Sequence, residues 1–155
     1  MVPIKEAITS GSWLQCEKRN NLFEANQFRI KVNSFRKLNL SEIDEPEEIN
    51  DLENSAVLWL MNIEVVNLNK EPTKTHNNVY GLKLVDNDDF IFPVFLDGHL
   101  NCFSDFAKTS GLKRFYAGTI LPKIKTLGSL VFQLPDDDDA EYFISLEDNG
   151  IVQEV

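Results

Sequence analysis

The sequence predicts an all-β protein, an antiparallel two-sheet sandwich of the immunoglobulin-like type with about seven strands and one or two short helical turns in its loops. Three observations predict this fold. Short segments of alternating apolar and polar residues recur along the chain, turn signals rich in Asp, Asn, Gly and Pro separate them, and no long segment has the period of a helix. Because the Cys and Trp spacing of antibody domains is missing, a barrel or a jelly roll remains an alternative.

The length and composition of the chain fit one domain, and its net charge limits the classes of partner. The chain of 155 residues is 43% hydrophobic and 26% charged, which is a globular composition without need of stabilising cross-links. We expect an N-terminal arm or edge strand over residues 1–21 and a single sandwich domain over residues 22–155. The net charge of −10 argues against nucleic acid and against anionic membrane surfaces as partners.

The charge is unevenly distributed along the chain. Up to Leu40 there are seven Lys or Arg against three acids, whereas the remainder has eight against twenty-two. Two interpretations stay open. Either the two parts neutralise each other once the chain is folded, or an acidic face is kept for a basic partner.

The first residues and the cysteines indicate a compartment. No apolar h-region is present, so no signal peptide is expected in this chain, and the longest apolar run, Ala56 to Met61, is too short to span a membrane. We expect a cytoplasmic protein, or an extracellular one if Met1 is not the native start. Cys16 and Cys102 are far apart and in no CxxC motif, and we expect two unpaired thiols.

The first clear strand is expected at residues 27–35, where Phe28, Ile30 and Val32 alternate with a basic face. Residues 41–54 follow with seven acids among fourteen residues. Acid runs of this kind are usually solvated, so we expect a loop with at most one or two helical turns.

The central strand of a sheet is expected at residues 56–68. Alternate positions from Val57 to Val65 are all apolar, so they lie on one side of a pleated strand. The opposite side begins apolar at Leu58 and Leu60 and then turns polar. A strand covered on one side throughout and on the other in part belongs near the middle of a sheet.

Five more strands complete the pattern. The acids of residues 86–89 are a strong turn signal between two of them and predict a hairpin, in which Pro93 is tolerated because its strand lies at an edge or is ending. The segment from residue 97 to 118 is irregular, with a short helix expected after Ser104. The five strands are expected at residues 79–86, 90–95, 126–134, 141–146 and 151–155.

Three segments carry turn and core motifs in a characteristic order: LWLMNIEVVNLNKEP, GLKLVDNDDFIF and ILPKIKTLGSLVFQLPDDDDAEYFISLEDNG. This order resembles a widespread group of bacterial immunoglobulin-like domains of unknown function, which includes the secreted mycobacterial immunoprotective antigens. Asp89 and Lys123 depart from the group's pattern, because both stand where it commonly has Gly. The matching positions are Leu84, Asp86, Phe92, Pro122, Gly128, Phe132 and Tyr142.

The resemblance implies the sandwich fold and no catalytic residue, since the group has no established catalytic site. Its members are often secreted or lipid-anchored. We expect a non-catalytic protein-binding module without cofactor or metal, and without nucleic acid or membrane insertion. A concrete version is an acidic inhibitor or immunity-type protein for a basic partner. The expected partner-binding residues are Glu42, Asp44, Glu45, Glu47, Glu48, Asp51, Glu53, Asp136, Asp137, Asp138 and Asp139.

Two other classes of function stay open. A calcium-stabilised adhesion or assembly module would use the acids of residues 86–89 and 136–139, provided that both turns lie at the same end of the sandwich. A small hydrolase would use Asp97 and His99, the only local acid and histidine pair. The GxSxG, HExxH, GxxxxGK and GxGxxG motifs are absent, and His76 and His99 are expected to be exposed loop residues.

Overall fold

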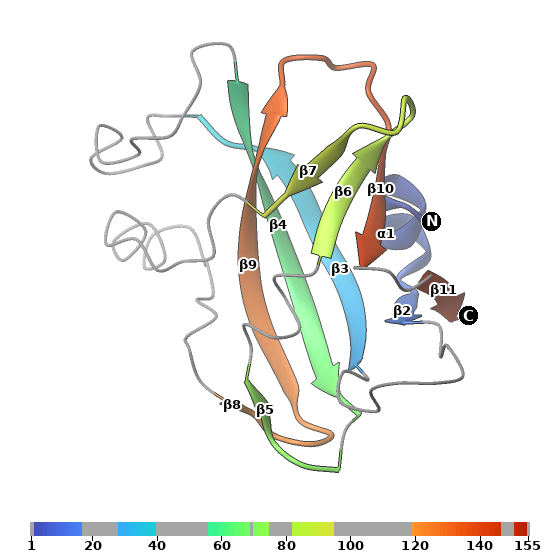
Figure 1. Cartoon of the computed structure of the whole chain (residues 1–155), viewed down its shortest axis with the longest axis vertical. Coiled ribbons are helices and arrows are strands. Elements are labelled where there is room, and N and C mark those ends of the chain that lie inside the picture. Colours follow the sequence, from blue (N-terminus) through green and yellow to red (C-terminus); the bar gives the residue numbers. More distant parts are fainter. Residues whose placement is uncertain are drawn as a thin grey trace.

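The computed structural model of the chain describes residues 2–16, 28–39, 56–68, 70–74, 82–94, 119–146 and 151–154, and all structural statements concern these residues. They form a sandwich of two antiparallel sheets, which confirms the predicted all-β fold (Figure 1). One sheet contains, in spatial order, β1 (Val2–Pro3), β10 (Tyr142–Leu146), β6 (Leu82–Asp86) and β7 (Ile91–Pro93). The other contains β11 (Ile151–Glu154), β2 (Trp13–Cys16), β3 (Phe28–Lys37), β4 (Ala56–Asn67) and β9 (Lys125–Pro135).

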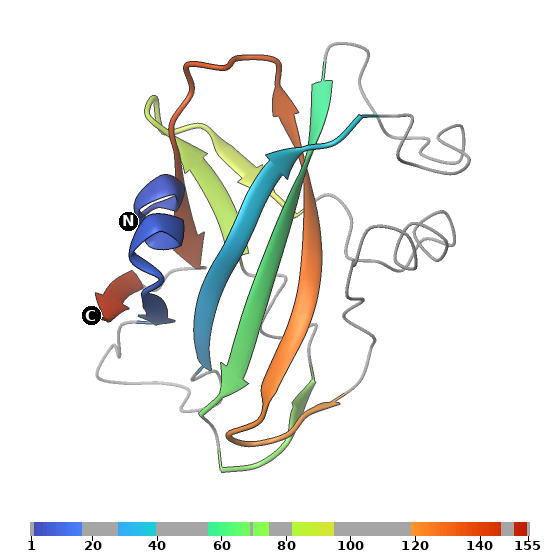
Figure 2. The ribbon, with the colours of Figure 1, turned by 180° about the vertical axis from the view of Figure 1, so that it is seen from behind.

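A third, short pair consists of β5 (Thr73–Lys74) and β8 (Thr119–Ile120) at one end of the molecule (Figure 1). Figure 2 shows the outer side of the five-stranded sheet, where β3, β4 and β9 run most of the length of the sandwich. The structure therefore has more strands than the seven expected from the sequence. The additional ones are β1 and β2, which lie within the residues 1–21 expected as an arm or edge strand, and β5 and β8. Each is at most four residues long and carries too little alternation to be placed individually from the sequence.

β4 is the strand that the sequence predicts near the middle of a sheet, and in the five-stranded sheet it is an interior strand next to the edge strand β9. It lies between β3 and β9, and its two sides are covered as expected. Met61, Ile63 and Val65 are buried in the core, whereas the opposite side is buried at its start, at Leu58 and Leu60, and half-buried beyond. The change along the outer side follows the change from leucine to polar residues in the sequence.

The core between the sheets draws on both of them. Successive side chains of a strand point to opposite faces, so only alternate residues enter it. The four-stranded sheet contributes Val2, Leu82, Leu84, Tyr142 and Ile144. The five-stranded sheet contributes Leu14, Ile30, Val32, Met61, Ile63, Val65, Leu130, Phe132 and Leu134.

The first residues are built into both sheets rather than into one element. β1 lies at the edge of the four-stranded sheet, and β2 lies between β11 and β3 in the other. Between them, α1 (Ile4–Ser10) buries Ile4 and Ala7 and ends at Gly11, whose left-handed backbone (φ 63°) donates its N–H to the Ile8 carbonyl at 3.2 Å. The helical turns expected at residues 41–54 and after Ser104 lie outside the described residues.

Candidate functional site

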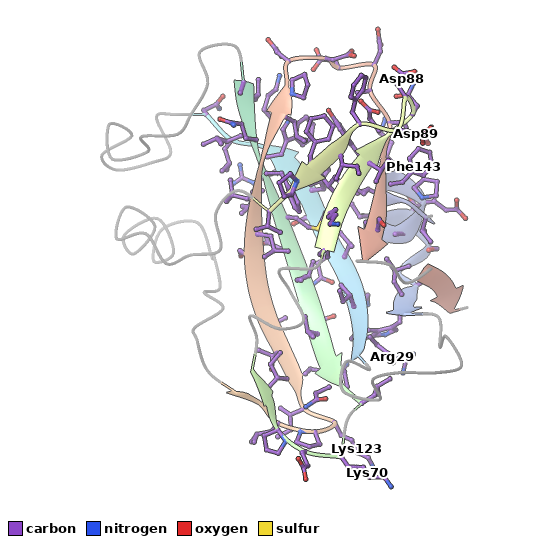
Figure 3. All side chains as sticks on the ribbon, in the orientation of Figure 1. Arg29, Lys70, Asp88, Asp89, Lys123 and Phe143 are labelled. Atoms are coloured by element: carbon purple, nitrogen blue, oxygen red, sulfur yellow. The ribbon has the colours of Figure 1, made fainter. Side chains whose placement is uncertain are left out.

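Most of the acidic side chains of the described residues lie at one end of the long axis of the sandwich, and four of the basic ones lie toward the other end. The acids Asp86, Asp88, Asp89, Asp136, Asp137, Asp138, Asp139 and Glu141 lie on the β6–β7 turn and the β9–β10 connection, which we call the acidic end. Arg29, Lys70, Lys123 and Lys125 lie toward the opposite, basic end. Figure 3 shows this polarity, with Asp88 and Asp89 at one end of the view and Lys70 and Lys123 at the other.

Strand register brings the two acidic segments together. Asp86, the last residue of β6, pairs with Tyr142, the first residue of β10. The turn that follows Asp86 and the connection that precedes Tyr142 therefore leave the sheet side by side. Residues about fifty positions apart in the sequence form one surface, as the calcium hypothesis required of them.

Backbone hydrogen bonds fix the shape of both acidic segments. The Asp86 carboxylate oxygen Oδ1 accepts from the backbone N–H of Asp88 and of Phe90, each at 2.9 Å. The Asp137 Oδ1 likewise accepts from the Asp139 N–H at 3.0 Å. These two carboxylates serve their own turns, which is a common role of aspartate, while Asp88, Asp89 and Asp139 are exposed.

Lys37, at the end of β3, neutralises part of the aspartate run. Its Nζ lies 3.0 Å from Asp136 Oδ1 and 3.5 Å from Asp138 Oδ1. The hydrogen bond to Asp136, with the nearby charges of Asp136 and Asp138, raises the pKa of Lys37 despite some desolvation. The basic first segment and the acidic remainder thus meet here as the first interpretation of the charge pattern expects. The exposed pair is worth little, because solvent screens it.

The phenol of Tyr142 lies close enough to both acidic segments for their carboxylates to shift its pKa. Burial of the side chain raises the pKa of Tyr142, and the carboxylates of Asp86 and Asp137 raise it further. Beneath it, the Phe35 and Phe92 rings meet Tyr142 edge-on at centroid distances of 6.4 and 5.9 Å. An aromatic cluster therefore supports the acidic end from the core side.

The acidic end also carries an apolar surface that the sequence did not identify as a site. Phe90 and Ile91 are 64% and 61% exposed and directly follow Asp88 and Asp89. Ile91 pairs with Val85, and Val85 pairs with Phe143, so the three form one row on the outer face of the four-stranded sheet. Figure 3 places Phe143 just below the two aspartates. A signal was present, since three consecutive apolar residues from Phe90 to Phe92 cannot all face the core.

The predicted site residues divide into two groups. Asp136, Asp137, Asp138 and Asp139 belong to the acidic end, with two of them paired to Lys37. Several others lie outside the described residues: Glu42, Asp44, Glu45, Glu47, Glu48, Asp51, Glu53, His76, Asp97, His99 and Cys102. The side chain of Cys16 is likewise not described.

The described part of the chain shows neither a metal-binding cluster nor a membrane-spanning helix. There, the His, Cys, Asp and Glu side chains form no group of three or more suited to a metal ion. The two acidic segments are neighbours, but Asp86 and Asp137 are turned to their own backbones. No helix in the described ranges is long and apolar enough to cross a membrane.

Comparison with known proteins concerns the fold. No protein-family model matches the chain, and neither does any curated protein. A crystal structure of a conserved hypothetical protein from Bacillus anthracis is similar, with a TM-score of 0.55 and 16% sequence identity over 90% of this chain and 96% of that one. At this identity the likeness shows a shared fold alone.

Two backbone angles bear on the resemblance to the bacterial immunoglobulin-like group. Asp89 and Lys123 have φ angles of 67° and 63°, and they are the non-glycine residues with positive φ in the described ranges. Both are positions where that group commonly has Gly, the residue that adopts this conformation most readily. Membership of the group stays a prediction.

Proposed function

We propose that this protein is a non-catalytic binding module that holds a basic protein at its acidic end. The observation that carries the proposal is the placement of exposed Phe90 and Ile91 directly beside exposed Asp88 and Asp89. Acids alone are usually solvated, but exposed aromatic and aliphatic side chains next to them supply the apolar contact that binding sites need.

The two parts of this surface have different roles. Carboxylates steer a basic partner toward the surface and orient it, which mainly raises the association rate. Phe90 and Ile91, once covered, supply the desolvated contact that slows dissociation. An acidic inhibitor or immunity-type protein that neutralises a basic partner is the concrete form of this function.

The test is affinity capture from the native lysate with the full chain, at low salt and at about 1 M salt, where the Debye length falls to about 3 Å. Three proteins are compared: wild type, the double variant Asp88→Asn/Asp89→Asn, and the double variant Phe90→Ala/Ile91→Ala. We expect one basic protein in stoichiometric amount with wild type, less of it at high salt, and little with either variant.

Two matched variants separate the surface from general effects. Glu6→Gln removes an exposed acid from α1, and Ile124→Ala removes an exposed aliphatic residue from the opposite end. Both should capture as wild type does. A partner retained equally by all five proteins would refute the acidic end as the binding surface.

A further inference from the structure

The basic end has exposed apolar residues of its own. Leu121 and Ile124 are 50% and 53% exposed on the turn between β8 and β9, and Leu127 is 44% exposed at the start of β9. The turn has a hydrogen-bonded conformation, in which the Ile124 N–H donates to the Leu121 carbonyl at 3.4 Å and Lys123 takes a left-handed backbone. In this conformation the turn exposes two aliphatic side chains.

Asn67 holds this loop in place from the interior. The residue is 1% exposed, and its side-chain Nδ2 donates to the carbonyls of Ile120 at 2.9 Å and Glu71 at 3.0 Å. Its own carbonyl accepts from the Lys123 N–H at 2.9 Å. One buried amide thus joins the connection after β4 to the β8–β9 turn. The conformation of this turn is therefore preorganised for binding.

The charge at this end is positive among the described side chains. Lys70, Lys123 and Lys125 are exposed around the turn. Trp13 contacts Lys125 and a further cation, with the Arg29 guanidinium 5.3 Å and the Lys125 ammonium 5.8 Å from its ring centroid. Glu71, next to Lys70, is the neighbouring acid in the same connection.

The two ends therefore match each other. Each is a tight turn with a charged residue in the left-handed conformation, Asp89 or Lys123, and each exposes two large apolar side chains beside it. Their charges are opposite, and they lie at opposite ends of the long axis (Figure 3). Complementary charge with apolar contact on both sides is the composition of a protein interface.

We propose that the basic end of one copy of this protein docks on the acidic end of a second copy, head to tail. This inference rests on the proposed function, because the same acidic end receives the partner, and it names a second copy of the chain as a partner. Such a contact joins two different surfaces, so it extends into an open row of copies rather than closing a dimer. Both tips are small, and the association is therefore weak and dependent on concentration.

The composition of the two ends favours a second copy over an anionic membrane as the occupant of the basic end. A net charge of −10 repels the chain from anionic lipid and from a second copy alike, but the acidic end of a second copy also offers exposed Phe90 and Ile91 to cover Leu121 and Ile124, which a layer of lipid headgroups does not. The orientation also leaves like charges far apart, since acidic ends never meet.

The test is sedimentation velocity of the full chain over a wide concentration range at low salt and at about 1 M salt. The sedimentation coefficient of wild type should rise with concentration at low salt, and the rise should be lost at high salt. The reversals Lys123→Glu/Lys125→Glu and Asp88→Lys/Asp89→Lys should each abolish it. The apolar variant Leu121→Ser/Ile124→Ser, which changes no charge, should reduce it as well, and circular dichroism checks that each variant is folded.

Mixing the two reversed proteins gives the decisive result. An equimolar mixture should associate again, because the intact acidic end of one protein meets the intact basic end of the other. Glu6→Gln should sediment as wild type does. A wild type that is monomeric at every concentration, or a mixture that stays monomeric, would overturn the proposal.

Other outcomes separate this inference from the proposed function. A monomeric wild type that still captures a basic protein through Asp88 and Phe90 would leave the proposed function standing and this inference refuted. Self-association through both ends, with a captured partner indifferent to the acidic end, would do the reverse. Monomeric protein that co-sediments with phosphatidylserine-containing vesicles only when Lys123 and Lys125 are intact would replace the second copy with a lipid surface.

Discussion

The acidic and the basic end of the sandwich expose similar turns, but different chemistry holds them. At the acidic end, the Asp86 carboxylate caps the β6–β7 turn, and the hydrogen bonds of this turn span at most four residues. At the basic end, buried Asn67 reaches Ile120, fifty-three residues away in the sequence. A local cap in contact with water and a buried link between distant segments differ in what they contribute to stability.

The largest expected effect breaks the buried link. Asn67→Ala leaves two carbonyls without their donor in or near the core, so the free energy of unfolding should fall by about 2–3 kcal/mol. Equilibrium urea unfolding measures it. Asp86→Ala, which removes two hydrogen bonds from the partly exposed acidic turn, is the comparison and should cost about 1 kcal/mol. Equal losses in the free energy of unfolding for the two variants would show that the local cap and the buried link contribute equally to stability.

The next effect concerns the left-handed residues. Lys123→Gly should raise the free energy of unfolding by about 0.5–1 kcal/mol, because a residue with a β-carbon is strained at φ 63° while the flexibility of Gly offsets part of the gain. Asp89→Gly should gain less, since aspartate tolerates this conformation better than lysine. Thermal unfolding of both variants, with Lys70→Gly as a control outside the turn, tests the order. A destabilised Lys123→Gly protein would contradict it.

A third prediction uses the field of the acidic end. The pKa of Tyr142 is raised above 10.0 by burial first, and then by Asp86 and Asp137. The neutral ring therefore contributes stability that is complete below about pH 10 and is lost as the pH rises through the raised pKa, since the unfolded state releases its proton first. Tyr142→Phe should remove that part of the alkaline loss in urea unfolding. Asp137→Asn should lower the pKa of Tyr142, measured by the tyrosinate absorbance that Tyr142→Phe removes.

The smallest expected effect comes from removing the Lys37 cation, which leaves the acidic end more negative. Lys37→Met removes an exposed cation from Asp136 and Asp138 and should leave the unfolding transition at neutral pH almost unchanged. It should modestly increase the rate at which a basic partner associates at low salt, and this increase should vanish at high salt. Stopped-flow kinetics measures the rate. A slower association would mean that Lys37 itself contacts the partner.

The sequence alone was enough for the strands that carry the sandwich. Seven strands overlap the residues expected for them, because alternation with period two is a local pattern that can be recognised from consecutive residues. They are β3, β4, β6, β7, β9, β10 and β11. The edge position of Pro93 in β7 was also confirmed. Turn chemistry was readable for the same reason, since Asp86 and its neighbours signal a turn within five residues.

Features that depend on distant residues could not be predicted in this way. Phe35, an aromatic residue, is expected at the core or its rim, although strict alternation along β3 would place it on the side of Arg29 and Lys31. A bulge between Val32 and Ser34 reverses the faces, so that Phe35 stacks on Trp59 at 4.8 Å and packs against the core. α1 was missed because seven residues carry too short a pattern, and its packing against the strands stabilises it.

By itself, the sequence determined the all-β class, the long interior strand β4 and the acidic composition of two turns. Only the tertiary structure decided that these two turns are neighbours, that Phe90 and Ile91 lie exposed beside them, and that Asn67 is buried under an oppositely charged tip. Strand formation depends on contacts within a few residues, whereas the meeting of two turns depends on which strands pair and in which register. The surface that the two acidic turns form together is therefore set by the pairing of β6 with β10.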